Sequence, residues 1–207
     1  MQKKRVTFIL NSLAVGGAER VMATLLGCSR EECEEFDVSL ILLDRVQEDY
    51  DIPDWLKVQR LDCSGSVWRS VDQVAKLIVK QQPDVTLSFL TRANVANVLA
   101  MRGRSCVISA RINTSAHLAA KPNPALNAAV RLTYPRASKI IAVSDDVGED
   151  LSANFGVRSE RIISIPNPVD VSGITRKARE PLPIAIDGPY IVAVGRLYGI
   201  KNFPLLL

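Results

Sequence analysis

Arg5-Val-Thr-Phe-Ile-Leu10, followed by Asn11-Ser-Leu-Ala-Val-Gly-Gly-Ala-Glu-Arg20, is the stretch that decides the fold. The first part is an apolar run with the length of one buried strand, and the second part enters a helix through Gly16 and Gly17. Because glycine has no Cβ, a ligand can approach the backbone closely at this turn. The N–H groups of the first helical turn favour a bound anion, so the pattern indicates a phosphate or phosphosugar. The alternative is a tight turn without a ligand, since the spacing is not the G-x-G-x-x-G fingerprint.

Apolar runs and helical periodicities alternate along the rest of the chain. The expected strands are 5–10, 38–43, 58–61, 85–89, 106–110, 139–143 and 161–165, and the expected helices are 18–28, 66–81, 91–101, 123–134 and 145–155. Ser144 and Gly156 are the expected caps of the last helix. This alternation predicts an α/β fold with a doubly wound, Rossmann-like, mainly parallel sheet over residues 1–170.

Residues 171–189 have the chemistry of a linker. Pro181, Pro183, Gly188 and Pro189 lie among mixed charges there, and no helical or strand periodicity is present. Residues 190–194 then predict a new strand, so we expect residues 190–207 to open a second domain.

Composition narrows the class of protein. The chain has 207 residues, of which 47% are hydrophobic and only 5% aromatic, as is typical of parallel strands covered by helices. No apolar run approaches the roughly 20 residues that cross a bilayer, and no signal-peptide cleavage site is clear, so we expect a cytoplasmic protein. The four cysteines form no C-x-x-C pair and His117 is the single histidine, which argues against a zinc site.

The span from Arg92 to Lys139 contains eight basic residues and no Asp or Glu. If these side chains gather on one surface, they favour anionic partners such as phosphosugars, acidic lipid headgroups or nucleic acid. The alternative is that they point in different directions in the folded chain and form no patch.

Three motifs follow one another at a spacing that one enzyme family shares. They are residues 15–21 (Val-Gly-Gly-Ala-Glu-Arg-Val), then residues 141–144 (Ile-Ala-Val-Ser) with 165–170 (Ile-Pro-Asn-Pro-Val-Asp), then residues 194–197 (Val-Gly-Arg-Leu) with Lys-Asn at 201–202. Together they resemble the retaining glycosyltransferases of family 4, which have the GT-B architecture of two Rossmann domains. The resemblance covers essentially the whole chain. It implies that residues 1–170 are the N-terminal acceptor-binding domain and that residues 190–207 start a truncated C-terminal donor-binding domain.

The resemblance also implies the substrates. The donor would be a nucleotide sugar, a UDP- or GDP-sugar, used without a metal or another cofactor. The acceptor would be a glycan or a lipid-linked sugar in the synthesis of bacterial surface polysaccharide or lipid-linked glycan. The basic span 92–139 would then suit an anionic membrane surface, which places the protein peripherally on the inner face of the membrane. No nucleic-acid partner is expected.

The resemblance assigns the donor diphosphate to four residues. Arg196 and Lys201 match the family's cations after the first C-terminal strand. Gly16 and Gly17 match the loop that faces the donor phosphates across the cleft. Two fixed cations suit this role, because the diphosphate leaving group gains negative charge as the sugar bond breaks.

The resemblance places the acceptor near residues 109–117. Arg111 is expected to hold an acceptor phosphate, with Asn113 as a second acceptor-binding residue. His117 is the candidate catalytic residue, since many members carry a histidine near the transferred sugar, although a surface histidine on a loop is the alternative. Members with the same glycine turn carry Ser-Glu-Arg-Asn here, where this chain has Ala110 and Ile112 around Arg111.

Asn167 lies in the family's interdomain segment, and the prolines on both sides of it stiffen the crossing. The family's acidic E-x7-E motif would lie beyond Leu207, so we expect the 207-residue chain to be inactive as a transferase by itself. Two other functions remain open. A sugar-nucleotide epimerase would need paired carboxylates and histidines. A non-catalytic nucleotide- or anion-binding Rossmann module would need an acidic residue after the second strand, where Asp44 lies.

Overall fold

A seven-stranded parallel sheet is the centre of the fold. The computed structural model describes residues 3–28, 32–120, 123–181, 188–195 and 202–206. Its strands run in the order β3-β2-β1-β4-β5-β6-β7, and every neighbouring pair is parallel. They are β1 (Lys4–Leu10), β2 (Phe36–Leu42), β3 (Lys57–Arg60), β4 (Val85–Phe89), β5 (Cys106–Ala110), β6 (Lys139–Ala142) and β7 (Ile162–Ser164). The predicted doubly wound α/β sheet is therefore confirmed. Strands β2 and β3 are added on one side of β1 and strands β4 to β7 on the other, so the strand order reverses between β1 and β4, which is where such folds bind their ligands.

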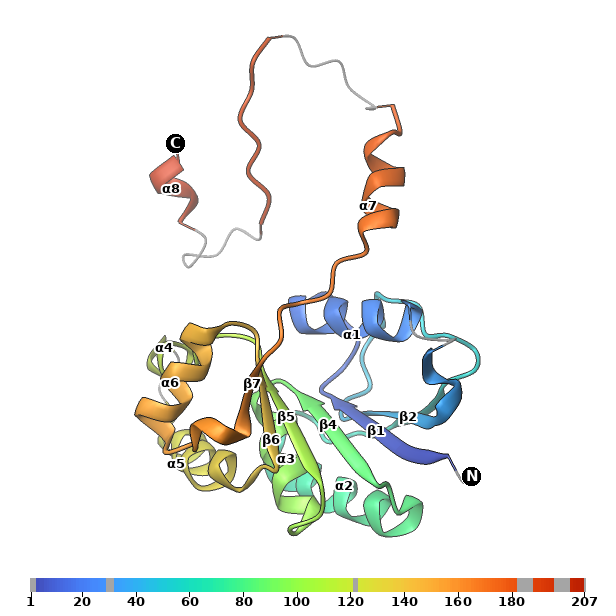
Figure 1. Ribbon diagram of the computed structural model, residues 1–207, viewed down its shortest axis with the longest axis vertical. Coiled ribbons are helices and arrows are strands. Elements are labelled where there is room, and N and C mark those ends of the chain that lie inside the picture. Colours follow the sequence, from blue (N-terminus) through green and yellow to red (C-terminus); the bar gives the residue numbers. More distant parts are fainter. Residues whose placement is uncertain (1–2, 29–31, 121–122, 182–187, 196–201, 207) are drawn as a thin grey trace. The chain divides into compact units, whose positions relative to one another are not determined.

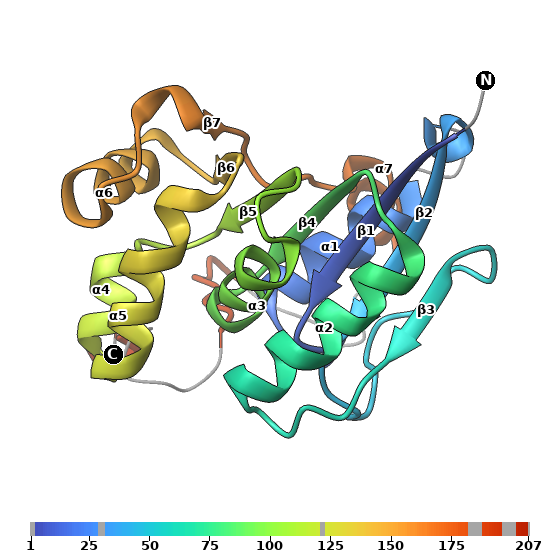
Figure 2. The ribbon, with the colours of Figure 1, turned by 90° about the horizontal axis from the view of Figure 1, so that it is seen from below.

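Helices cover both faces of this sheet (Figures 1 and 2). They are α1 (Gly17–Cys28), α2 (Val67–Gln81), α3 (Thr91–Met101), α4 (Thr114–Ala120), α5 (Pro124–Thr133) and α6 (Asp145–Phe155), with short 3-10 turns η1 (Glu32–Glu35), η2 (Tyr134–Arg136) and η3 (Ser159–Arg161). The sequence pattern did not predict α4. Ser144 stands at the N-cap of α6 but its side chain makes no cap hydrogen bond, whereas Gly156 ends α6 with a left-handed backbone as predicted.

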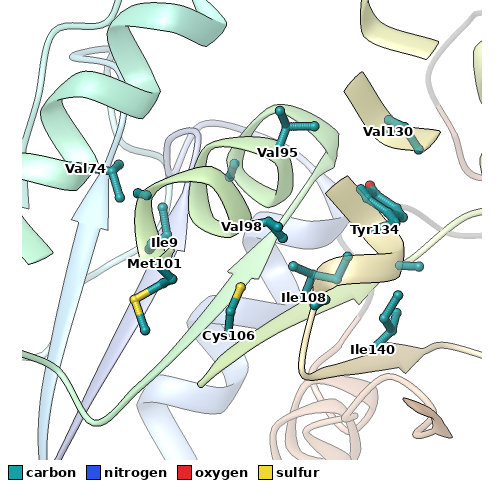
Figure 3. Close-up of a cluster of buried hydrophobic side chains, with 14 of the residues drawn as sticks. Ile9, Val74, Val95, Val98, Met101, Cys106, Ile108, Val130, Tyr134 and Ile140 are labelled. Carbon is teal, nitrogen blue, oxygen red and sulfur yellow. The ribbon is translucent and has the colours of Figure 1, made fainter. Parts of the chain in front are cut away.

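The fold has two hydrophobic clusters, one on each face of the sheet, and successive side chains of β1 point into one cluster and then the other. Ile9 belongs to the cluster beneath α2 and α3, and the next residue, Leu10, belongs to the cluster beneath α1. Figure 3 shows the first cluster, in which Val95 and Val98 of α3 lie over Ile108 of β5. Burial of each such side chain stabilises the fold by about 1.5–3 kcal/mol. Both faces are covered, which explains the continuous apolar runs of the strands.

Polar groups are also buried between α3 and the sheet. Asn97 accepts a hydrogen bond from Thr86 Oγ1 (2.7 Å) and donates to Ser88 Oγ (3.0 Å). Asn94 donates to the backbone carbonyl of Ser109 (3.0 Å). Because these buried partners satisfy one another, α3 is fixed in one position on β4 and β5.

The chain divides into two compact units, Met1–Val169 and Asp170–Leu207. In the second unit, α7 (Val171–Ala178) begins where the Asp170 side chain accepts the N–H of Gly173 (2.8 Å), so the prediction of no regular element there is wrong for these residues. Residues 190–194 were predicted as a strand and are not one, because no described segment pairs with them. A short helix, α8 (Phe203–Leu206), follows. The linker and the donor domain themselves stay predictions.

Candidate functional site

A pocket of about 560 Å³ lies at the carboxyl ends of the strands in the first unit. Its wall comes from the residues that directly follow β1, β4 and β5, together with α4 and α5. This is the edge beside the switch point between β1 and β4, where ligands bind in open parallel sheets. The volume is in the range of small-molecule sites.

The turn between β1 and α1 forms one wall of the pocket, and two residues of the segment that follows β2 form hydrogen bonds to it. The N–H of Val15 donates to the Asp49 carboxylate (2.8 Å), and the Tyr50 hydroxyl donates to the Gly16 carbonyl (3.2 Å). Helix α1 begins at Gly17, which lines the pocket, and Gly16 directly precedes it. The predicted glycine turn thus lies at the carboxyl edge of β1. Its assignment to the donor diphosphate stays a prediction.

Glu19 lies over Gly16. A Cβ placed on Gly16 would come within 2.0 Å of Glu19 Oε2, so the absence of a side chain at Gly16 is what admits the carboxylate. Glu19 also lines the pocket. No cation of the described residues forms an ion pair with Glu19.

Leu90, between β4 and α3, has an unusual backbone for a leucine. Its φ of 74° and ψ of 146° belong to a region that glycine favours and that costs other residues about 1–3 kcal/mol. Leu90 lines the pocket, as does the following Thr91. Strain of this kind persists where the surrounding structure requires it, which supports a functional role for this edge of the sheet.

Arg111 reaches the pocket from the end of β5. Its guanidinium carbon lies 4.9 Å from the centre of the Phe89 ring, and its Nη1 donates to Asn167 Oδ1 (2.7 Å). Its Nε is buried and has no hydrogen-bond partner among the described residues. Burial lowers the pKa of the Arg111 guanidinium from its usual value, yet arginine remains protonated at neutral pH. An anion in the pocket would relieve this desolvated charge.

His117 lines the same pocket from α4 and is half-buried. It lies on a helix rather than on the loop that the sequence suggested. Asn113 does not line the pocket. Its Oδ1 accepts the N–H of Ala116 (2.8 Å) and the hydroxyl of Ser115 (3.0 Å), so its side chain caps the start of α4.

Asp150 of α6 holds the start of α4 through hydrogen bonds. Its carboxylate accepts the backbone N–H groups of Thr114 (2.8 Å) and Ser115 (3.1 Å), the Ser115 hydroxyl and the Asn154 amide (2.9 Å). Burial by itself raises the pKa of Asp150, but these hydrogen bonds outweigh it and hold the pKa below its ordinary value. The negative charge also suits the N-terminus of a helix. Asp150 therefore positions the helix that carries His117.

Asp44, which a ribose-binding Rossmann module would need, is already engaged. Its carboxylate forms an ion pair with Arg92, whose Nη1 lies 3.1 Å from Asp44 Oδ1, and it accepts the N–H of Gly65 (3.2 Å). Arg92 itself lines the pocket. The described contacts therefore disfavour the dinucleotide-binding alternative.

The structure brings together Gly17, Arg111, His117 and Asn167 of the predicted site, while Gly16 adjoins it. Arg196 and Lys201 lie outside the described residues. Asn11 and Glu19 were not assigned to the site from the sequence. Asn11 directly follows the apolar strand β1 at its carboxyl edge, and that position was the available signal.

The basic residues of span 92–139 are distributed over several elements. Arg92 and Arg111 line the pocket, Arg104 follows α3, and Arg131 packs over an aromatic ring of α6 at 5.3 Å. Lys121 is outside the described residues. Binding of an anionic membrane through this span stays a prediction.

The residues that the structure describes contain no group of three or more His, Cys, Asp and Glu side chains arranged to hold a metal ion. No described helix has the length and apolar character needed to span a bilayer.

Comparison with known proteins gives the family. The sequence profile described as Glycosyltransferase Family 4 matches residues 15–172, which confirms the resemblance seen in the motifs. A curated relative from Campylobacter jejuni subsp. jejuni serotype O:2 is 29% identical over 220 residues and is named N-acetylgalactosamine-N,N'-diacetylbacillosaminyl-diphospho-undecaprenol 4-alpha-N-acetylgalactosaminyltransferase. The match covers 99% of this chain and 58% of that relative, so this chain spans little more than half of its length.

Solved structures share the fold at low sequence identity. The galactosyltransferase WaaB of the lipopolysaccharide outer core superposes with a TM-score of 0.60 at 14% identity, over 81% of this chain and 46% of that one. Anabaena HepE in complex with UDP superposes with a TM-score of 0.59 at 19% sequence identity, and the match covers 81% of this chain and 45% of that chain. A Listeria monocytogenes protein described as a UDP-N-acetylglucosamine 2-epimerase superposes with a TM-score of 0.55 at 16% sequence identity, and the match covers 78% of this chain and 45% of that chain. Transferases and epimerases share this architecture, so the fold by itself does not separate them.

Proposed function

The chain belongs to glycosyltransferase family 4, and on that premise we propose that it is the acceptor-binding part of an enzyme that moves a sugar from a nucleotide sugar to an acceptor. The observation that carries the proposal is Arg111 in the pocket. Arg111 is half-buried, its buried Nε has no partner among the described residues, and its guanidinium stacks on Phe89. A guanidinium held this way binds a phosphate strongly and in a fixed orientation. The pocket then takes an acceptor that carries a phosphate next to a sugar.

The proposed chemistry uses a diphosphate leaving group. As the bond between the donor sugar and the diphosphate breaks, negative charge grows on the diphosphate, and fixed cations or backbone N–H groups stabilise it. Arg196 and Lys201 are proposed for this role from the family motif. The family resemblance also offers the turn at Gly16 and Gly17, and the Glu19→Gln variant described below tests that use of the turn. His117 lines the pocket, where it can lie near the transferred sugar. No metal is required by this scheme.

The acceptor that we propose is a sugar joined through a diphosphate to a lipid. The Campylobacter relative is named for such an acceptor, a diphospho-undecaprenol glycan. The donor is proposed to be a UDP-sugar, with GDP-sugars as the second choice, because HepE was solved with UDP and with UDP-glucose. Peripheral binding at the inner face of the membrane would bring the pocket to this acceptor.

Binding of N-acetylgalactosamine 1-phosphate to the 207-residue chain tests the proposal. Arg111→Leu removes one charge-assisted contact worth about 1.5–3 kcal/mol, so its affinity should fall about ten- to hundredfold. Arg136→Leu is the matched control, because Arg136 is exposed and does not line the pocket. Equal affinity of wild type and Arg111→Leu, or no binding by the wild type, would contradict the proposed acceptor site.

Membrane binding is tested separately with vesicles. The chain should sediment with vesicles that contain anionic lipid and should remain in solution with vesicles of neutral lipid only, and salt should weaken the binding. Equal binding to both kinds of vesicle would remove the electrostatic argument while leaving the acceptor site untouched.

A further inference from the structure

Two side-chain hydrogen-bond acceptors lie on the wall formed by β1 and α1. Glu19, in the first turn of α1, holds its carboxylate directly over Gly16 and at the pocket surface. Asn11, the first residue after β1, also lines the pocket. Its Oδ1 is buried and accepts no hydrogen bond from any described residue. A buried acceptor without a donor is destabilising, so this site gains free energy when a ligand supplies a donor.

The opposite wall carries the positive charge of Arg111 and also includes His117. Asn11 and Arg111 follow β1 and β5, which are separated by β4 alone, so the two walls are about two strand spacings, roughly 10 Å, apart. A sugar ring with a phosphate substituent can bridge this separation, with its phosphate at Arg111.

We propose that Asn11 and Glu19 bind hydroxyl or amide N–H groups of the acceptor sugar and thereby determine which sugar is accepted. This inference rests on the proposed function, because it assumes that the phosphate of the same acceptor lies at Arg111. A carboxylate accepts hydrogen bonds from two neighbouring hydroxyls at once, and these charge-assisted bonds are about twice as strong as neutral ones. A site built this way rejects an analogue that lacks the hydroxyl, because its buried acceptors are then left unpaired.

The position of Glu19 argues against binding of a diphosphate at the Gly16 turn. If the turn at Gly16 held a diphosphate while Glu19 stayed where it is, two negative groups would be in contact. The two assignments therefore predict opposite effects for Glu19→Gln. Loss of the charge weakens the binding of a sugar hydroxyl but strengthens the binding of a diphosphate.

The experiment titrates the 207-residue chain with N-acetylgalactosamine 1-phosphate and, in parallel, with inorganic phosphate and UDP. Glu19→Gln and Asn11→Leu should each bind the sugar phosphate about tenfold more weakly, while their affinity for inorganic phosphate stays within about twofold of the wild type. Glutamine caps a helix start as well as glutamate does, so Glu19→Gln preserves any structural role of the side chain. Asn11→Asp keeps an acceptor oxygen and should retain the affinity for the sugar phosphate. Glu149→Gln, on the exposed surface of α6, is the control for the change in net charge.

The outcomes separate the inference from the proposed function. Wild-type affinity for the sugar phosphate in both Glu19→Gln and Asn11→Leu overturns the inference alone, provided that Arg111→Leu still weakens binding. If Glu19→Gln binds UDP more tightly and keeps the wild-type affinity for the sugar phosphate, the inference is overturned in favour of a diphosphate at the turn. If the wild type binds no sugar phosphate at all, the proposed function itself fails.

Discussion

Replacement of Asp150 by asparagine should loosen the helix that carries His117. Asp150 is 6% exposed, and its carboxylate accepts two backbone N–H groups of α4, at 2.8 and 3.1 Å, besides two side-chain donors. Asparagine has nearly the same shape but only one acceptor oxygen and no charge. Each hydrogen bond to a charged group contributes about 1.5–3 kcal/mol, so we expect a loss of about 2–3 kcal/mol. For a chain of this size, that corresponds to a melting temperature lower by about 4–12 °C.

The pH dependence identifies the carboxylate as the cause. The pKa of Asp150 in the folded chain is below its ordinary value, near 3.8, to which it returns on unfolding. Its contribution is therefore fully present above the unfolded pKa and is lost as the pH falls through the folded pKa. Urea unfolding of the wild type and Asp150→Asn should show the full difference at about pH 7 and a shrinking difference below about pH 4.

Two results would refute this reasoning. The first is an equal free energy of unfolding for Asp150→Asn and the wild type at neutral pH. The second is a difference that keeps its size in acid, which would mean that the charge does not hold α4. Glu149→Gln, which removes a neighbouring exposed carboxylate of α6, serves as the control and should change stability by less than about 0.5 kcal/mol.

Three further predictions concern groups around the sheet. Asn97→Leu removes three hydrogen bonds to buried groups, so chemical denaturation should show a loss of about 2–4 kcal/mol, and an unchanged midpoint would contradict the network. Burial raises the pKa of the Cys106 thiol to about 12, so mass spectrometry should find Cys106 unmodified by iodoacetamide in the folded chain at about pH 8 and modified in urea, and equal rates in both would be inconsistent with its burial. Asp44→Asn removes the counter-charge of Arg92 at the pocket, so inorganic phosphate should bind about two- to fivefold more tightly, and weaker binding would show that Arg92 does not face the ligand.

The fold was predictable because its strands and most helices have strong local signals. Continuous apolar runs marked the parallel strands, and Ser70, Val74 and Ile78 lie on the buried face of α2 at helical spacing. The short helix α4 gave no such signal, since it has seven residues with the sequence Thr-Ser-Ala-His-Leu-Ala-Ala. Its position depends on Asp150, 35 residues from Ser115 along the chain, and such long-range contacts are not visible in local periodicity.

The location of the site was predictable, but the use of its side chains was not. The carboxyl ends of parallel strands meet at one edge, so the turn at Gly17 and the residue Arg111 were expected near one another. That Asn113 caps α4 instead of facing the pocket depends on its side-chain rotamer. The pairing of Asp44 with Arg92 joins residues from two different strand ends, 48 positions apart. Sequence spacing alone does not fix such contacts.

The most direct test of the central claim is a map of the residues that respond to a sugar phosphate. The two-dimensional 1H–15N NMR spectrum of the 207-residue chain is recorded during titration with N-acetylgalactosamine 1-phosphate. We predict saturable shifts at the amides of residues 11–19, 90–92, 111–117 and 167, which surround the pocket. Saturable shifts confined to the other end of the sheet, or no shifts at all, would contradict the claim that this pocket receives the acceptor.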